Sequence, residues 1–204
     1  MVCIGLINGY RRCTTAPKCA PKTVKKRHEI TSYTARYGEN RFHDARYILL
    51  LLCKPDTIYS GFLGSIDQID IVSDFINQNK NAYVIVDPVM GDGGNYYQTF
   101  NDEICNKIKD LVKVSDLVTP NLTEACLLTN NKYHTNYTLE DTLKLAKEIA
   151  NLGPKKVIIT GILIDDNIIN LGYDKESDES FSYSLKYNNK SYSGTGDIFT
   201  SIIS

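Results

Sequence analysis

The chain has no long apolar run, no paired-cysteine motif and no leader-like start, and each absence excludes a class of protein. Its longest apolar stretch, Ile48–Cys53, is far short of the ~18–20 residues that a membrane-spanning helix needs. Six cysteines are present, but none forms a C-x-x-C pair, so we expect neither a zinc site nor disulfides. The first residues lack the basic, apolar and small-residue order of a secretory signal. We therefore expect a cytoplasmic protein with reduced thiols and no membrane partner.

Charge is divided unevenly along the chain. Residues 1–55 contain 11 Lys and Arg against 3 Asp and Glu, a balance of +8, whereas residues 56–204 contain 12 against 21, a balance of −9. The first segment shows no regular period over Thr14–Asn40, and only Ile48–Leu52 is expected there as a strand. We interpret residues 1–55 as an atypical basic segment, either frameshifted or disordered. The alternative is a basic arm that binds nucleic acid or an acidic partner. Asn and Tyr are scattered throughout the chain and make that fit unspecific, so no nucleic-acid partner is expected.

From Asp56 onward, apolar runs alternate with helical periods. The expected strands are Thr57–Leu63, Ala82–Val86, Asp116–Thr119, Val157–Thr160 and a hairpin of Ile168–Tyr173 with Phe181–Tyr187. Helices are expected after a capping box at Ser65–Gln68, over Ile104–Val112, from about Asn121 to Thr129, from an N-cap at Thr138 to Gly153, and from Gly194 onward. This alternation predicts an α/β fold with a mostly parallel sheet and helices on both faces.

A glycine-rich tetrapeptide, Gly194-Thr195-Gly196-Asp197, has the form of an anion-binding helix start. Two glycines let the backbone approach an anion, and successive amides with the helix dipole favour negative charge there. Asp197 would repel a phosphate, but it suits a base that accepts a proton from an alcohol attacking that phosphate. The alternative is an ordinary capped helix start with an acid in its first turn.

Polar clusters follow several of the expected strands. They are Asp87 to Asp92, Thr119-Pro120-Asn121 with Glu124, and Thr160-Gly161. The carboxyl ends of parallel strands are where α/β sheets bind ligands, and Asp87 with Asp92 is suited to a hard cation. Asp92-Gly93 taken alone would be no more than a turn. Together with the glycine-rich helix start, the clusters predict a phosphoryl-transfer site.

The segments IYSGFLGS with Gln68, then DPVMGD, TPNLTEA, VIITG and SGTGD, occur in this order. The combination resembles the pyridoxal (pyridoxine) kinases of the ribokinase superfamily, over about Asp56 to Ser204. The resemblance implies a ribokinase-like three-layer sandwich, incomplete in this chain. It also implies ATP-dependent phosphorylation of the 5′-hydroxymethyl group of pyridoxal, pyridoxine or pyridoxamine, with Mg²⁺ and a monovalent cation such as K⁺.

The same resemblance implies roles for individual residues. Asp197 would be the catalytic base, with Gly194, Thr195 and Gly196 as the anion hole. The ATP side would comprise Thr119, Asn121, Glu124, Thr160 and Tyr97, with Asp92, Glu124 and Asp87 at the metal. Phe62 and Asn8 would lie on the vitamin side, Asn8 standing where a serine is usual. Homodimers are common in the family, and the sequence leaves the oligomeric state open.

Both ends depart from the family pattern. Gly9–Thr14 matches its N-terminal run only faintly, and nothing downstream matches the Ser-Asn-His-Thr-Gly motif that closes the vitamin pocket. We expect the kinase domain, residues 56–204, to be truncated, which would leave the apolar residues Ile198 to Ile203 with few partners. Two alternatives follow: a hydroxymethylpyrimidine kinase of thiamin synthesis, whose ATP side would look alike, or an inactive nucleotide-binding remnant.

Overall fold

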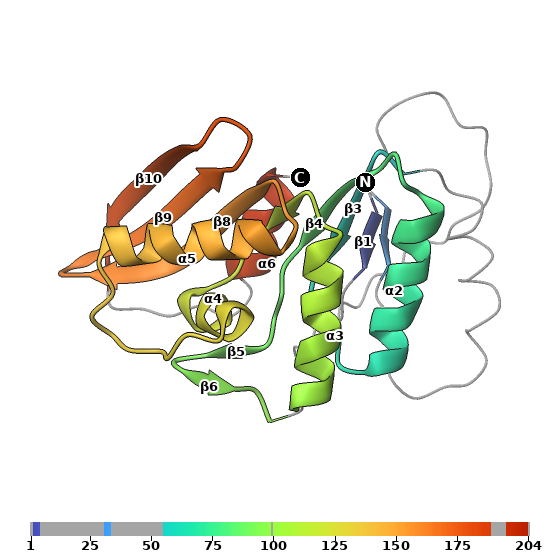
Figure 1. Ribbon diagram of the computed structural model, residues 1–204, viewed down its shortest axis with the longest axis horizontal. Helices are drawn as coiled ribbons and strands as arrows, with labels where there is room; N and C mark the ends of the chain where they lie inside the picture. Colours follow the sequence, from blue (N-terminus) through green and yellow to red (C-terminus); the bar gives the residue numbers. More distant parts are fainter. Residues whose placement is uncertain (1, 5–30, 34–54, 99, 189–194, 204) are drawn as a thin grey trace, which may run out of the picture.

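One mixed sheet organises the chain in the computed structural model, which describes residues 2–4, 31–33, 55–98, 100–188 and 195–203. Eight of the strands described there form it, in the order β10-β9-β8-β7-β4-β3-β1-β2 (Figure 1). They are β1 Val2–Ile4, β2 Thr31–Tyr33, β3 Thr57–Ser60, β4 Tyr83–Val86, β7 Leu117–Val118, β8 Lys156–Ile164, β9 Asn167–Asp174 and β10 Glu179–Lys186. Pairing is parallel from β2 to β8, and β8, β9 and β10 pair antiparallel.

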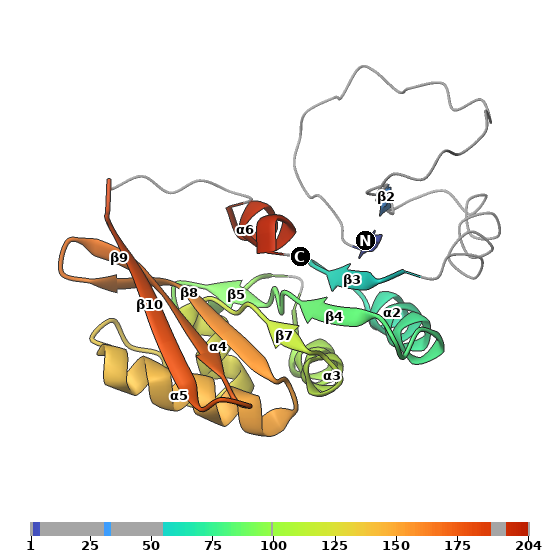
Figure 2. The ribbon, with the colours of Figure 1, turned by 90° about the horizontal axis from the view of Figure 1, so that it is seen from above.

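Helices lie on both faces of this sheet, as the sequence predicts. The helices are α2 Ile66–Gln78, α3 Asp102–Lys113, α4 Leu122–Thr129, α5 Leu139–Leu152 and α6 Thr195–Ile203. Figure 2 shows α2 to α5 together on one face and α6 on the other. The α/β class with a mostly parallel sheet is therefore confirmed. None of the described helices is long and apolar enough to cross a membrane.

Local capping explains where these helices begin. Thr138 and Asp141 cap α5 reciprocally, because the Thr138 hydroxyl accepts from the Asp141 amide and the Asp141 carboxylate accepts from the Thr138 amide. The predicted capping box of α2 is half right. Ser65 caps the helix, but the Gln68 side chain accepts from the Gly64 amide, 2.8 Å away and one residue upstream of the expected partner.

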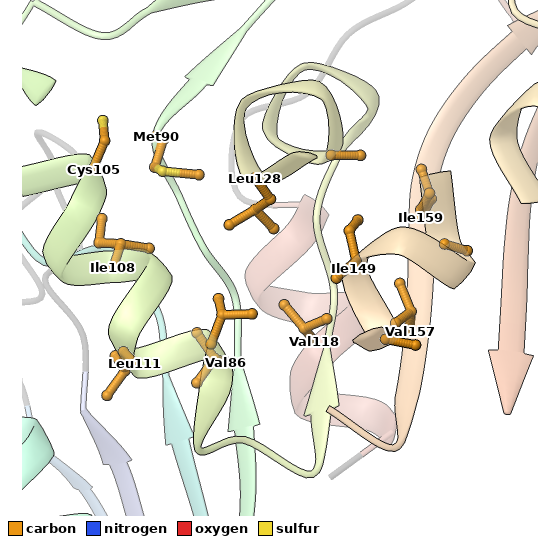
Figure 3. Close-up of a cluster of buried hydrophobic side chains, with 14 of the residues drawn as sticks. Val86, Met90, Cys105, Ile108, Leu111, Val118, Leu128, Ile149, Val157 and Ile159 are labelled. Carbon is orange, nitrogen blue, oxygen red and sulfur yellow. The ribbon is translucent and has the colours of Figure 1, made fainter. Parts of the chain in front are cut away.

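The core lies between the sheet and helices α2 to α5. Figure 3 shows Val86, Val118 and Val157 of three adjacent strands facing Ile108 and Leu111 of α3, Leu128 of α4 and Ile149 of α5. Alternate residues Tyr59, Ile85 and Leu117 form a smaller buried cluster on the opposite side of the sheet. Burying one such side chain contributes about 1.5–3 kcal/mol, so the central strands are held from both sides.

Strand β8 differs from its prediction, because Thr160-Gly161 is not a strand end. The strand continues to Ile164 through a register irregularity between Ile159 and Ile162. Gly161 has φ +70°, a left-handed conformation that glycine adopts without steric cost, and this lets the strand bend and resume pairing with β9. Thr160 also forms a parallel β-bridge with Asn121, which lies shortly after strand β7.

The basic N-terminal segment contributes two short strands to the same sheet. Thr31–Tyr33 lies within the stretch for which no structure is expected, so that expectation is wrong at this point. It pairs in parallel with Val2–Ile4, which in turn pairs with β3. A strand of three residues is too short to show an alternating pattern in the sequence, so its extended conformation depends on the strand with which it pairs. The strand expected at Ile48–Leu52 lies outside the described residues.

Apolar side chains remain exposed on the α6 side of the molecule. In α6, Ile198 and Ile202 are 63% and 78% exposed, as the sequence predicts for residues with few partners. Phe181 and Tyr183 of the edge strand β10 are 62% and 63% exposed. This side of the sheet thus carries much less packing than the side covered by four helices.

Candidate active site

The carboxyl edge of the parallel strands carries three polar residues named from the sequence. Asp87 directly follows β4, and its amide donates to the Ser60 carbonyl at the end of β3. Thr119 directly follows β7, and its amide donates to the Val86 carbonyl. Asp87 and Thr119 are buried, and Thr160 in β8 is half-buried. The strand backbones therefore bring these side chains to one edge of the sheet.

The N-terminus of α4 is built around Glu124, which is 3% exposed. Its carboxylate accepts from the Asn121 amide at 2.8 Å and from the Met90 amide at 3.2 Å. The Asn121 side chain caps the helix by accepting from the Glu124 amide, and its Nδ2 donates to the Gly91 carbonyl at 2.8 Å. Asn121 and Glu124 thus tie α4 to the loop that leaves β4, and both face the candidate site from a fixed backbone.

Glu124 and Asp87 form a strained electrostatic pair. Burial raises the pKa of Glu124 well above its ordinary value, and the nearby charge of Asp87 raises it further. Amide hydrogen bonds from Asn121, Met90 and Gly91 oppose the rise in pKa without cancelling it. Two buried carboxylates whose charges act on each other are a place where a cation would be favoured.

The first turn of α6 lies against this pair. A Cβ placed on Gly196 would be 3.5 Å from Asp87 Oδ2, so the glycine backbone faces that carboxylate closely. One helical turn further on, the Thr200 hydroxyl meets the Thr119 hydroxyl at 3.2 Å, and both are buried. Thr195 opens the helix as predicted. Asp197 lies in its first turn, and a helix start of this kind favours an anion.

A short hairpin carries two further predicted residues. It consists of β5 (Gly91–Asp92) and β6 (Asn95–Tyr96), with Tyr97 directly after it. Asp92 is exposed, and its carboxylate accepts from the Gly93 amide. Burial raises the pKa of Tyr97, and the negative charges of Glu124, Asp92 and Asp87 raise it further.

An aromatic chain links this hairpin to the predicted vitamin side. Phe100 is 9% exposed, and its ring meets Phe62 edge-on, with centroids 5.5 Å apart. On its other side Phe100 contacts Tyr97, with centroids 6.3 Å apart. Phe62 is therefore joined through one buried ring to the residue beside the carboxylates.

A preformed metal cage is absent from the part of the chain that the structure describes. No group of three His, Cys, Asp or Glu side chains is placed there to hold a metal ion by itself. The charge of Asp87 acts on Glu124, and both act on Tyr97 together with the charge of Asp92 on the hairpin. Mg²⁺ characteristically binds one or two carboxylates together with substrate phosphates and waters, so this donor set fits it without a complete cage.

Two predicted site residues, Asn8 and Gly194, lie outside the described residues, and the Asp197 side chain is not described either. Other residues at the site have no signal in the sequence. They are Thr200, which meets Thr119, the Met90 amide, which binds Glu124, and Phe100. Ser60 also stands at this edge, and its fully buried hydroxyl finds no hydrogen-bond partner among the described residues. Only its position in the IYSGF run at a strand end could have drawn attention to it.

A mostly parallel sheet with helices on both faces, and with buried carboxylates at the strand ends beside a helix start, is a ribokinase-like α/β arrangement. The chain belongs to the phosphomethylpyrimidine kinase family, whose model matches residues 48–204.

Individual relatives agree with this assignment. The pyridoxal kinase of Arabidopsis thaliana is 29% identical over 155 residues, covering 72% of this chain and 48% of the relative. A Bacteroides thetaiotaomicron protein assigned as a phosphomethylpyrimidine kinase, in a crystal form with pyridoxal, is 34% identical with a TM-score of 0.72. That match covers 78% of this chain and 57% of the other. The Staphylococcus aureus pyridoxal kinase in complex with AMP-PCP and pyridoxal is 28% identical with a TM-score of 0.60, covering 73% and 52%.

The chain spans about half the length of the curated relatives it matches; for the Arabidopsis thaliana protein the share is 48%. The match therefore shows the family and the fold of the shared part.

Proposed function

We propose that this chain transfers the γ-phosphoryl group of ATP to the 5′-hydroxymethyl group of pyridoxal, pyridoxine or pyridoxamine. The observation that carries the proposal is the first turn of α6 lying against the buried carboxylates, with Gly196 facing Asp87 Oδ2. A phosphoryl group needs a helix start with close backbone approach, and nearby acids to handle a cation and a proton. Relatives of this chain have been crystallised with pyridoxal and with an ATP analogue, which supports both substrates.

Asp197 is the base in this proposal. It would take the proton from the attacking hydroxyl, while the backbone amides of Gly194, Thr195 and Gly196 stabilise the charge on the phosphoryl oxygens. Thr195 and Gly196 stand at the start of α6, and amides held in such a place need no reorientation as charge develops. Proximity of base, acceptor and anion hole is the main source of rate in phosphoryl transfer, where the protein does little covalent chemistry.

Five residues would form the ATP side: Thr119, Asn121, Glu124, Thr160 and Tyr97. Asn121 is engaged as a cap and as a donor to Gly91, but an amide NH₂ carries two hydrogens, so that bond does not exhaust it. The Tyr97 hydroxyl, close to three carboxylates, would act as a neutral donor towards a phosphate, since its pKa is raised.

A magnesium ion fits the carboxylates present. Asp87, Asp92 and Glu124 would hold it, and it would neutralise charge on the phosphate oxygens. Asp87, Thr119 and Thr160 offer the hard oxygen atoms that a monovalent cation such as K⁺ requires. Phe62 and Asn8 would contact the vitamin, Phe62 through its ring face or edge against the pyridine ring. The reaction belongs in the cytoplasm, and the oligomeric state, with a homodimer as the family precedent, is left for direct measurement.

The test is ATP- and Mg²⁺-dependent formation of pyridoxal 5′-phosphate by the purified chain. Asp197→Asn should lower kcat by about 10²–10⁴-fold, the usual share of a general base. Asp70→Asn, an exposed change on α2 at a carboxylate that pairs with Lys107, should leave kcat unchanged. Product from Asp197→Asn at the parental rate would refute the assigned base. No product from a folded parent that binds ATP would favour the inactive nucleotide-binding remnant.

A second candidate is phosphorylation of hydroxymethylpyrimidine, favoured by the family model that matches residues 48–204. The ATP-binding residues would serve either reaction, so the two functions differ only in the acceptor substrate. Running both acceptors in the same assay separates the two functions. A kcat/KM for the pyrimidine tenfold above that for pyridoxal would reverse the assignment.

A further inference from the structure

The β5–β6 hairpin needs an anchor that its own two strands do not supply. It has two pairs of residues, Gly91 with Tyr96 and Asp92 with Asn95, and its tip residues Gly93 and Gly94 have φ +57° and +82°. Positive φ at both tip positions is typical of the tightest hairpin turns. An isolated two-stranded hairpin is marginal in water even when it is much longer than this one. Contacts with the rest of the fold must therefore decide where it stands.

Its base is held by the residues already assigned to the site. Glu124 accepts from the Met90 amide, and Asn121 donates to the Gly91 carbonyl. These attachments fix where the hairpin starts, but none of them reaches its tip, so its tilt depends on other contacts. Asp92 and Tyr97 both move with that tilt, because one lies in the first strand and the other directly follows the second.

The tip has its own two contacts, and neither belongs to a residue considered so far. The Gly94 amide donates to the Thr123 hydroxyl at 2.9 Å, and Thr123 is only 2% exposed. The Tyr133 ring lies directly over Gly94, since a Cβ there would be 2.5 Å from Tyr133 Cδ1. Tyr133 is itself packed against the main core. The hairpin tip is thus clamped between α4 and the chain that follows it.

We propose that Thr123 and Tyr133 are positioning residues that fix the tilt of the β5–β6 hairpin, and so set where Asp92 and Tyr97 stand relative to Asp87 and Glu124. The Thr123 hydroxyl oxygen accepts the hydrogen bond from the Gly94 amide, and a side chain without an acceptor at this position cannot replace it. Tyr133 supplies a flat surface that only a glycine at the tip can approach. Neither residue touches the reacting atoms; they act through the hairpin.

The decisive variant is Thr123→Val, which keeps the shape of the side chain and removes the acceptor. Thr123→Ser keeps the acceptor and is the conservative rescue. Thr142→Val is the matched control, because Thr142 is also fully buried and its hydroxyl donates to the Thr138 carbonyl in α5. All three are made in the full 204-residue chain.

Hydrogen exchange of the backbone amides reads the clamp directly and needs no activity. Amides of residues 91–97 should exchange about tenfold faster in Thr123→Val than in the parent or in Thr123→Ser, while those of α5 stay unchanged. Thr142→Val should show the reverse pattern. Unchanged exchange over residues 91–97 in Thr123→Val would overturn the proposal, whatever the chain catalyses.

Kinetics then tests the consequence, and this part rests on the proposed function. Thr123→Val should raise KM for MgATP about five- to tenfold, the effect of one buried hydrogen bond, with KM for pyridoxal within twofold of the parent. A variant that only destabilises the fold would lower the amount of active enzyme without raising KM for MgATP selectively, as Thr142→Val should show. Equal KM for MgATP in Thr123→Val and the parent would refute the positioning role. An inactive parent with the expected exchange pattern would instead refute the proposed function and leave the clamp standing.

Discussion

The buried carboxyl of Glu124 should make this chain less stable as pH rises from acid to neutral. Its pKa is raised above the ordinary value of 4.5, by burial first and by Asp87 second. The folded chain therefore holds this proton to a higher pH than the unfolded chain does. The stabilisation is fully present below the unfolded pKa and is lost as pH rises through the folded pKa.

The size of the effect is bounded by one proton. Between the unfolded and the folded pKa of one group, the free energy of unfolding falls by at most ~1.4 kcal/mol per pH unit. Three other described carboxyl groups have lowered pKa values, namely Asp141, Asp174 and Asp178. Their contributions are present above the unfolded pKa and are lost on acidification through the folded pKa, so they act at lower pH than Glu124.

The assay is urea unfolding at several pH values from 5 to 8, without nucleotide or Mg²⁺. Glu124→Gln should remove the downward slope, independently of its absolute stability, because Gln does not titrate. Asp87→Asn should shift the slope to lower pH, since it removes the charge that raises the pKa of Glu124. Glu103→Gln, an exposed change on α3, should keep the parental slope. Parallel stability curves for Glu124→Gln and the parent would refute the reasoning.

Two further predictions concern packing. Phe100→Ala removes the buried ring between Phe62 and Tyr97 and should lower the free energy of unfolding by about 3–5 kcal/mol in a urea melt, and a loss under 1 kcal/mol would contradict it. Gly172→Ala places a Cβ against the Phe181 ring, but that ring is 62% exposed and can turn into solvent, so the free energy of unfolding should fall by less than about 1 kcal/mol; a loss above about 2 kcal/mol that Phe181→Ala does not relieve would show that the ring is not the cause.

Much of the fold could be predicted because local signals and tertiary packing agree. The run Ala82–Val86 is apolar throughout and does form a buried central strand. Thr138 does cap α5, and the two strands of the predicted hairpin do pair antiparallel, as β9 and β10. In each case a few adjacent residues determine both the type of element and where it begins or ends.

What could not be predicted depends on contacts between distant residues. The continuation of β8 past Gly161 needs pairing with β9, and the strand Thr31–Tyr33 needs its neighbour Val2–Ile4. At the site, the carboxylates could be named from their place after strands. The roles of the Met90 amide and the Thr200 hydroxyl could not be predicted, because every residue except proline has a backbone amide and threonine is common in helices.

The helices cover the two faces of the sheet unequally, and this affects how the proposed activity would be lost. The main core lies between the sheet and α2 to α5, whereas α6 sits on the other face with two isoleucines mostly in solvent (Figure 2). Detaching α6 would expose little new apolar surface and would break few contacts of the main core, so its opening is a low-energy event compared with global unfolding. In the proposed function, however, α6 supplies Asp197 and the anion hole. Opening of α6 would therefore stop the proposed phosphoryl transfer while the sheet and helices α2 to α5 remain folded.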